Sequence, residues 1–411
     1  MSLSDLVSFI LEGKVMKKSF LAVSISMMAT FGVQADLIQH TDQIAEIKFT
    51  GSTYELGKHV GEVGKEQILD GIQRFDDTLG VMLPGLNVKG LSATFAKNDV
   101  FNKLVKSSPD AGRYIQGLSE SLDLDPNYLL AVGMSDEAIL ESQRNGGVGF
   151  LQAEKPAHDP SAPAKCTAMA VKSKDGKSWV AHNFDYMGVN YDGLMMLNHT
   201  DVDGKTRIIQ TWIGLIPYGG VTKGAQAFSV NTMADSGLLR QNAGGEILDK
   251  NAIPSFYLSW DAYNAQSYDD VVDVFTKYPK YTAFFTYTLA AADQPAMNIE
   301  NVYGGKVNVT KGDWVAHSNH TIKGEAEDFV DENFAANSMA RLAKAQEFVS
   351  QADANTPKNE IRQVLESKPL WKGRGEMMGT VTSTVFKING EQVDMFIKTD
   401  EAHPEVHIKN Y

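Results

Sequence analysis

The stretch that decides the fold runs over residues 154–186 and reads EKPAHDPSAPAK, CTAMAVKS, KDGK, SWVAHNFDY. Its first part, residues 154–165, contains three Pro and three Ala without apolar periodicity, which predicts an irregular linker. Two alternating apolar segments follow, residues 166–173 and 178–186, with an Asp-Gly pair between them. Asp-Gly between such segments is a strong hairpin signal. The chain therefore passes at Cys166 from a linker directly into a β-hairpin.

Similar turn signals recur through the C-terminal part of the chain. Asp-Gly, Gly-Gly and Asn-Gly pairs join alternating segments, which are Leu194–Thr200 with Thr206–Trp212, Asn298–Tyr303 with Lys306–Thr310, and Thr380–Ile388 with Glu391–Lys398. Helical spacing is found in Tyr268–Lys277, Ala335–Ser350 and Asn359–Ser367. Antiparallel hairpins interleaved with helices predict an α+β fold in which stacked sheets are covered by helices.

The N-terminus has the pattern of an export signal. Two lysines follow Met16, and residues 20–33 form an apolar run. A cleavage site of small residues then ends at Ala35. An uncleaved membrane anchor is the alternative, but the apolar run is short for a bilayer span. We expect residues 1–35 to be a signal peptide with an N-terminal extension, cut after Ala35, which predicts a periplasmic or secreted protein.

The remaining chain divides at the linker. Residues 36–165 are expected to form a mainly helical segment after a strand at Glu46–Thr50. Residues 166–411 are expected to form the strand-rich catalytic segment, and the two segments together are expected to make one domain.

Composition limits the function classes. The formal net charge of −13 argues against nucleic-acid binding and against an anionic membrane surface, because both need a basic face. The single cysteine excludes a disulfide within the chain and any cysteine-based metal cluster. A metal pair at His317 and His320 is the other option considered, but the preceding residues predict a strand, on which this spacing does not suit metal binding. We therefore expect no metal and no cofactor.

Cys166 carries the remaining chemistry. If the Lys165–Cys166 bond were cut, the α-amino group of Cys166 would be a general base a few ångströms from its own thiol. This arrangement activates a nucleophile without a histidine. The hairpin returns Asp185 to the Cys166 end, where a carboxylate could hold the new amino group. A buried structural thiol is the alternative.

Several motifs, in order, resemble the acyl-coenzyme A:6-aminopenicillanic acid acyltransferase family (isopenicillin N acyltransferase-like), which belongs to the N-terminal nucleophile (Ntn) hydrolases. These motifs are Gly51–Gly57 with Gly61, Ile115–Leu118 with Leu122–Leu124, Cys166–Ala168, Asn183–Tyr186, His317–His320, Ser338 with Arg341, and Thr380–Phe386. The resemblance covers most of the chain after residue 35. It implies an αββα sandwich of four layers, with two antiparallel sheets covered by helices.

The resemblance also implies roles for matching residues. Cys166 would be the self-processing residue and the nucleophile, and Asp185 would bind its new α-amino group. Asn319 would donate a hydrogen bond to the oxyanion, and Asn231 resembles a second donor in the bile salt hydrolase branch. Arg341 resembles the arginine that supports the nucleophile or the substrate.

Each of these residues also has an ordinary structural interpretation. Asp185 could be a turn or edge-strand acid, and Asn319 and Asn231 could bond their own backbone. Arg341 could pair with an acid on a helix face.

Two positions depart from the family's pattern. His182 stands where the bile salt hydrolase and penicillin V acylase branch has Arg. Lys165 precedes the nucleophile where the fungal acyltransferase has Gly.

The function implied is self-cleavage between Lys165 and Cys166, followed by hydrolysis of the amide bond of N-acylated small molecules through an acyl-thioester. The alternatives are acyl transfer through the same thioester, a phospholipase B-like lipid hydrolase, and an inactive protein that binds an acylated ligand. The partners expected are the small substrate and the two chains of one precursor, with no nucleic acid and no membrane after signal cleavage. Homo-oligomerisation is left open.

Overall fold

Two β-sheets occupy the centre of the structure, which is a computed structural model. It describes residues 37–135, 137, 166–233, 254–277, 285–302, 306–322, 332–374 and 378–410. The nine-stranded sheet has the spatial order β1 (Leu37–Gln39), β2 (Ile44–Thr50), β5 (Leu194–Thr200), β6 (Thr206–Trp212), β7 (Ile216–Val221), β8 (Ala227–Thr232), β9 (Phe285–Ala290), β10 (Ala296–Val302) and β11 (Lys306–Gly312). The six-stranded sheet has the order β12 (Trp314–His317), β3 (Thr167–Lys174), β4 (Lys177–Met187), β13 (Met378–Asn389), β14 (Gln392–Lys398) and β15 (Val406–Asn410).

The predicted hairpin lies at the centre of the six-stranded sheet. Strands β3 and β4 pair antiparallel, with Thr167 opposite Asn183. Asp175 and Gly176 take left-handed φ angles of 54° and 73° at the turn, a conformation that Gly and Asp adopt more readily than most residues. This pairing brings the C-terminal end of β4 beside Cys166.

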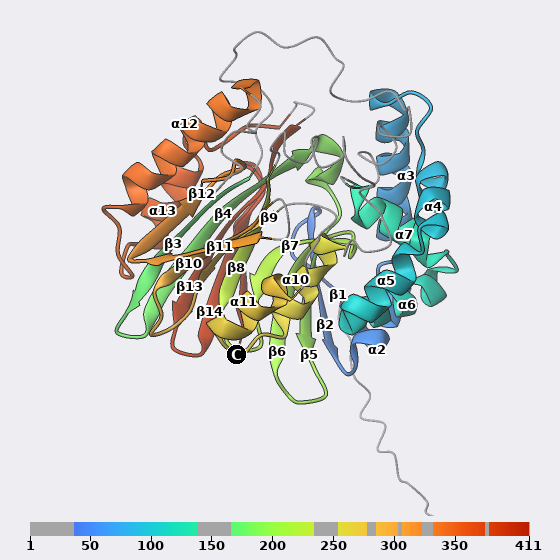
Figure 1. The fold of residues 1–411 in the computed structure, drawn as a ribbon, viewed down its shortest axis with the longest axis horizontal. Helices are drawn as coiled ribbons and strands as arrows, with labels where there is room; N and C mark the ends of the chain where they lie inside the picture. The colour runs from blue at the N-terminus through green and yellow to red at the C-terminus, as the bar shows by residue number, and fades with distance from the viewer. Residues whose placement is uncertain are drawn as a thin grey trace, which may run out of the picture. The chain divides into compact units, whose positions relative to one another are not determined.

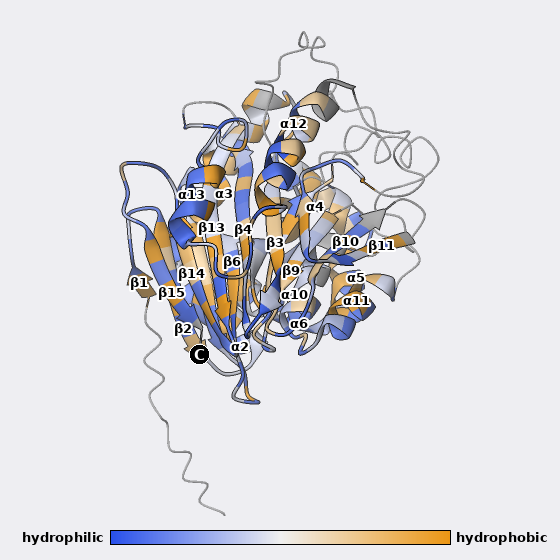
Figure 2. Ribbon diagram, turned by 90° about the vertical axis from the view of Figure 1, so that its left-hand side faces the viewer, coloured by the Kyte–Doolittle hydropathy of each residue, from blue (hydrophilic) through white to orange (hydrophobic). Residues whose placement is uncertain are grey.

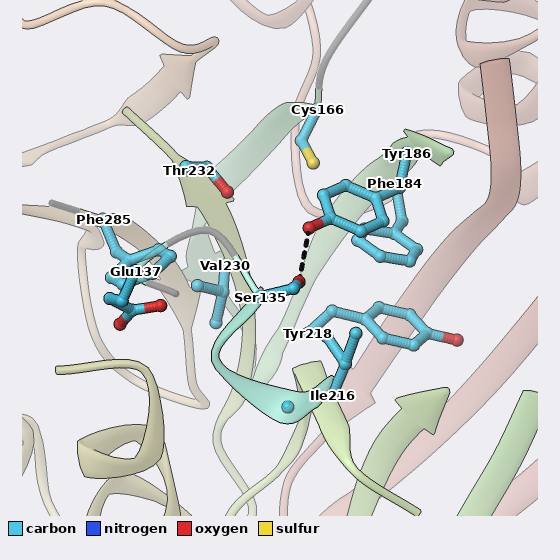
Figure 3. A pocket seen from close by; sticks show the side chains of 11 residues that line it. Ser135, Glu137, Cys166, Phe184, Tyr186, Ile216, Tyr218, Val230, Thr232 and Phe285 are labelled. Atoms are coloured by element: carbon cyan, nitrogen blue, oxygen red, sulfur yellow. Dashed lines mark hydrogen bonds between the residues drawn. The ribbon is translucent and has the colours of Figure 1, made fainter. Parts of the chain in front are cut away.

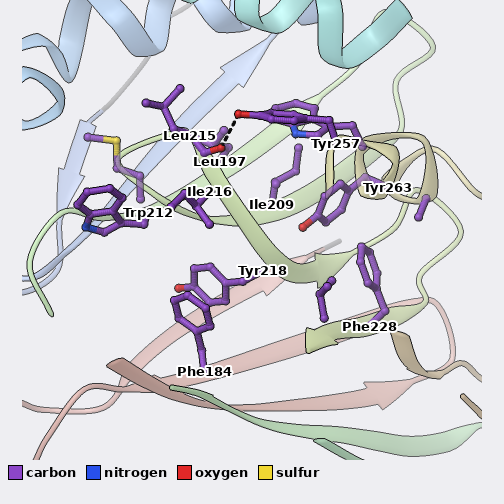
Figure 4. Packing of buried hydrophobic residues seen from close by; sticks show 14 of the residues in the cluster. Phe184, Leu197, Ile209, Trp212, Leu215, Ile216, Tyr218, Phe228, Tyr257 and Tyr263 are labelled. Carbon is purple, nitrogen blue, oxygen red and sulfur yellow. Dashed lines mark hydrogen bonds between the residues drawn. The ribbon is translucent and has the colours of Figure 1, made fainter. Parts of the chain in front are cut away.

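The two sheets pack face to face through apolar side chains of their inner surfaces. Phe184 of β4 stacks on Tyr218 of β7 with ring centroids 4.2 Å apart and an interplanar angle of 6°. Figure 4 shows this pair between the two sheets, with Trp212 and Phe228 also in the core. Alternation along each strand places these residues inward, as sheet-on-sheet packing requires.

Helices cover the outer faces of both sheets (Figure 1). The six-stranded sheet is covered by α12 (Glu332–Val349) and α13 (Lys358–Leu365). The other helices are α2 (Thr53–Val63), α3 (Lys65–Met82), α4 (Val88–Lys97), α5 (Val100–Ser107), α6 (Pro109–Leu122), α7 (Pro126–Gly133), α10 (Ser255–Tyr263) and α11 (Tyr268–Thr276), with a short 3-10 turn η2 (Gly188–Tyr191). Among these, α2, α10 and α11 contact the nine-stranded sheet directly.

Helix α12 shows why a helix fits this position. Along it, hydrophilic and hydrophobic residues alternate in Figure 2, and its buried side chains Leu342, Ala345 and Val349 recur at helical spacing. They pack on Met169 and Ala316 of the six-stranded sheet in a second hydrophobic cluster. The apolar stripe therefore fixes which face of α12 meets the sheet.

The layer order is helices, sheet, sheet, helices, so the α+β four-layer αββα sandwich is confirmed. One detail differs from two purely antiparallel sheets, because β2 pairs parallel with β5. A parallel pair needs a long crossover, and here the helices α2 to α7 and the β3–β4 hairpin lie between the two strands in sequence.

The expected strands and helices occur close to their expected bounds. Strands β1, β7, β8, β9, β12 and β15 have no counterpart among the segments predicted from hairpin signals. The expected signal peptide (residues 1–35), the linker and Lys165 lie outside the described residues. No helix in the part of the chain that the structure describes is long and apolar enough to cross a membrane.

The Gly51–Gly57 motif has a structural explanation in α2. Ser52 and Glu55 form a capping box, in which the Ser52 N–H donates to the Glu55 carboxylate and the Glu55 N–H donates to Ser52 Oγ. Gly57 then lets α2 approach α6, since a Cβ at this position would lie 2.1 Å from the Tyr114 carbonyl oxygen. Gly117 of α6 makes the reciprocal approach to Tyr54 at the same distance.

We predict that Gly57→Ala lowers the free energy of unfolding by about 1–3 kcal/mol, because the clash is with backbone that cannot turn aside. Gly80→Ala is the matched control, since the nearest atom to its added Cβ is 3.9 Å away and the residue is an exposed helical position. This control should gain about 0.5–1 kcal/mol from helix propensity. Urea unfolding of both variants tests the prediction, and equal stability of the two would contradict it.

Candidate active site

Cys166 lies at the start of the six-stranded sheet's β3 strand, with its side chain buried. It is 3% exposed, and its Sγ is 3.8 Å from the carbonyl oxygen of Asp185, which accepts from the thiol. In Figure 3 the sulfur points into a pocket between Thr232 and Tyr186. The sole cysteine of the chain therefore lines a cavity at the border of the main apolar cluster, of which it is also a member.

The cavity beside Cys166 is small in this structure, about 20 Å³. Its aromatic lining comes from both sheets and comprises Phe184, Tyr186, Tyr218 and Phe285. Its polar lining comprises Ser135, Glu137 and Thr232, and Ser135 shares a 3.1 Å hydrogen bond with the Tyr186 hydroxyl (Figure 3). A pocket of this character accepts a ligand with an apolar body and a few polar atoms.

Asp185 is the most unusual group beside Cys166. It is fully buried, and neither carboxylate oxygen has a hydrogen-bond partner among the described residues. Burial raises the pKa of Asp185 to about 7, against the opposing effects of Arg341, Thr380 and Lys372. A buried carboxylate without a hydrogen-bond donor is costly, so this position is suited to receive a positive donor.

Arg341 of α12 ties the start of β3 to the neighbouring loop. Its Nη1 donates to the Cys166 carbonyl oxygen at 2.5 Å and to Thr167 Oγ1 at 2.9 Å. Its Nη2 donates to Asn319 Oδ1 at 2.8 Å, and its Nε donates to Asn337 Oδ1. This buried guanidinium thus bonds the backbone of Cys166, and it does not pair with an acid on an exposed helix face.

Asn319 follows β12 and also lies at this site. Its Nδ2 donates to the Thr232 carbonyl oxygen at 2.6 Å, while its backbone N–H donates to Ser338 Oγ at 2.9 Å. Thr232 lines the pocket beside Cys166. The Asn319 amide is therefore buried behind a residue of the pocket wall, with both of its polar side-chain atoms bonded.

Asn231 of β8 bonds differently. Its Nδ2 donates to the carbonyl oxygens of His317 and Ser318, at 3.2 and 2.9 Å, so in this structure these bonds hold the loop that carries Asn319. Its Oδ1 has no hydrogen-bond partner among the described residues.

His182, the departure from the related branch, lies on β4. It is fully buried, and burial lowers its pKa to about 3, with a smaller opposing effect of Asn231. Its imidazole is therefore neutral at physiological pH, so no positive charge replaces the arginine of that branch.

The histidines considered as a metal pair have other partners. His317 Nε2 is 2.7 Å from Glu300 Oε1, and His320 Nδ1 is 2.8 Å from Ser338 Oγ. Within the described ranges, no group of three or more His, Cys, Asp or Glu side chains is placed to hold a metal ion. The two histidines instead belong to a hydrogen-bonded network around Asn319.

The structure thus brings Cys166, Asp185, Asn319, Asn231 and Arg341 together at one end of the β3–β4 hairpin. Sequence reasoning did not single out Glu300, Thr232 or Tyr186. An acidic residue within a buried stretch of a strand is a weak indication of a functional group, and Glu300 is such a residue. Nothing in the local sequence indicated that His317 is its partner. Lys165, the residue before the expected cut, is not among the described residues.

No protein-family model matches the sequence, and no curated protein matches it. Solved structures similar to the chain include a Caenorhabditis elegans ortholog of N-acylethanolamine-hydrolyzing acid amidase, at 16% identity and a TM-score of 0.40, covering 55% of this chain and 93% of that one. A mutant conjugated bile acid hydrolase from Clostridium perfringens has 13% identity and a TM-score of 0.40, and the match covers 59% of this chain and 92% of that one. Penicillin V acylase from Agrobacterium tumefaciens has 12% identity and a TM-score of 0.33, and the match covers 59% of this chain and 85% of that one.

We predict that Asp185→Asn stabilises the protein at pH 8 by about 3 kcal/mol when it is compared with Asp185 in a Cys166→Ala background. This is the scale of a buried charge without a partner. The folded pKa of Asp185 is raised, so its contribution to stability is present at low pH and lost as pH rises through about 7. At pH 5 the gain should therefore shrink below about 1 kcal/mol. Urea unfolding at both pH values measures it.

The matched control for this pH dependence is Asp175→Asn, at an exposed turn position where Asn also tolerates the left-handed conformation. It should change stability equally at pH 5 and pH 8. If the Asp185→Asn gain is likewise independent of pH, Asp185 does not carry a buried charge.

Proposed function

We propose that this chain is a self-processing N-terminal cysteine amidohydrolase that cleaves N-acylated small molecules. The observation that carries the proposal is the buried Asp185 carboxylate, without a hydrogen-bond partner among the described residues, beside the only cysteine of the chain. A new α-amino group at Cys166 would supply the positive donor that this carboxylate lacks.

The first step is self-cleavage. Cys166 Sγ attacks the carbonyl carbon of Lys165, the bond to the Cys166 nitrogen breaks, and that nitrogen takes up the thiol proton. Water then hydrolyses the thioester, which leaves a carboxylate on Lys165 and restores the thiol. Arg341 supports this step, since its bond to the Cys166 carbonyl oxygen fixes the backbone next to the bond that breaks.

The same thiol then acts on the substrate. The α-amino group first takes the thiol proton, which gives a thiolate and an ammonium that bonds to Asp185. The thiolate attacks the amide carbonyl, and the ammonium returns the proton to the leaving amine as the tetrahedral intermediate collapses to a thioester. Water hydrolyses the thioester. Asn319 and Asn231 are the proposed donors to the oxyanion. The Asn319 amide has a second N–H besides the one bonded to the Thr232 carbonyl, whereas the Asn231 amide would have to release one of its two carbonyl partners.

The pocket supports an acyl group with apolar or aromatic character, because Phe184, Tyr218 and Phe285 line it. Transfer to an amine through the same thioester is chemically equivalent until the last step. Hydrolysis is favoured after export, since water is abundant there and acyl-coenzyme A is not. We also propose that residues 1–35 direct this export and are removed.

We predict that the purified mature protein consists of two fragments, residues 36–165 and residues 166–411, when its intact mass is measured under denaturing conditions. Cys166→Ala should give one fragment beginning after Ala35, because no thiol can attack Lys165. A single uncut chain in both proteins would overturn the proposed mechanism.

We further predict that the processed protein hydrolyses N-acyl amides with an aromatic or aliphatic acyl group and accumulates an acyl-enzyme at Cys166. Product release and the mass increase on the fragment beginning at Cys166 are measured together. Turnover of acyl esters without any amide turnover would contradict amidohydrolysis and favour the lipid-hydrolase alternative.

A further inference from the structure

A buried acid and histidine join the two sheets beside the proposed site. Glu300 lies on β10 of the nine-stranded sheet, and His317 ends β12 at the edge of the six-stranded sheet. Glu300 Oε1 and His317 Nε2 are 2.7 Å apart, and their side chains are 3% and 1% exposed. None of the chemistry proposed above uses this pair.

The Glu300 carboxylate holds both ends of one short segment, residues 317–322. Besides His317, its Oε1 accepts the backbone N–H of Ile322 at 2.7 Å, and its Oε2 accepts from Asn308 Nδ2 at 3.2 Å. Burial alone raises the pKa of Glu300, but His317, Ile322 and Asn308 outweigh it, so that the pKa falls below its usual range. The carboxylate is therefore ionised and fully engaged as an acceptor.

Asn319 lies inside the segment that this carboxylate closes. Ser338 Oγ contacts Ser318 Oγ, the Asn319 N–H and His320 Nδ1, at 2.8, 2.9 and 2.8 Å. Arg341 and the Thr232 carbonyl oxygen hold the Asn319 side chain. The segment is fixed at its ends by Glu300 and at its middle by α12, and Asn319 is its residue that bonds to the pocket-lining Thr232.

We propose that Glu300 and His317 are positioning residues, which fix segment 317–322 so that Asn319 keeps its amide at the oxyanion position beside Cys166. The proposal rests on the proposed function, since it concerns the oxyanion of that reaction. Buried polar or charged pairs can often be replaced by apolar residues of similar volume without loss of stability, so we assign this pair a role in the geometry of the site. A donor held in place before the reaction is worth about 10²–10³ in rate.

The test compares two reactions of Cys166 in the processed protein. A p-nitrophenyl ester acylates the thiol through an oxyanion, and the burst of p-nitrophenolate gives the rate. Iodoacetamide alkylates the thiol by displacing iodide from a saturated carbon, and no oxyanion forms. A residue that positions an oxyanion donor affects the first reaction selectively, whereas general damage to the site affects both.

We predict that Glu300→Ala slows acylation at least 30-fold and changes alkylation less than about threefold. Glu300→Gln keeps an acceptor for His317 and Ile322 and should acylate within about fivefold of the wild type. His317→Phe keeps an aromatic ring but no nitrogen, so it should behave as Glu300→Ala does.

The control is Asp110→Ala, which removes a carboxylate of α6 that is bonded to the buried Arg207 of β6, and neither residue lines the pocket. Both of its reaction rates should stay within about threefold of the wild type. Equal losses in both reactions for Glu300→Ala, no loss in either, or failure of both Glu300→Ala and His317→Phe to fold would overturn the positioning role. A wild-type protein that gives neither an acylation burst nor alkylation at Cys166 would instead refute the proposed function itself.

Discussion

A carboxylate buried without a hydrogen-bond donor is the constraint on which this site depends. Asp185 lies between strands β3 and β13 beside Cys166, and burial holds its pKa near 7. Neither carboxylate oxygen has a close hydrogen-bond donor among the described residues, and Arg341, Thr380 and Lys372 offset the cost of burial only in part. An ammonium group formed at Cys166 would remove that cost, which links the energetics of the fold to the proposed cleavage.

Around this carboxylate, the sandwich builds a rigid frame from both sheets and from α12. Arg341 connects Cys166 to Asn319, and Ser338, one turn earlier on the same helix, fixes the backbone of Asn319. Asn231 and Glu300 reach the same segment from the nine-stranded sheet. Because each sheet contributes to the segment, the relative position of the sheets sets the geometry of the site.

Local sequence signals predicted the parts of this site that depend on local structure. The Asp175-Gly176 turn fixed the register of β3 and β4, and therefore the approach of Asp185 to Cys166. Ser338 and Arg341 lie three residues apart on a helix, and this spacing predicts that they share one face. The Glu300–His317 pair could not be predicted from local sequence, because it joins strands of different sheets. Nor was β7, whose sequence IPYGGV contains a Pro and two Gly and lacks a strand's usual alternation.

A crystal structure of the purified mature protein would show whether Cys166 and Asp185 pair as proposed. The account predicts a free α-amino group on Cys166 with its nitrogen about 3 Å from a carboxylate oxygen of Asp185. An amino group directed away from an Asp185 that still lacks a donor would contradict the account. So would a Cys166 nitrogen still bonded to Lys165.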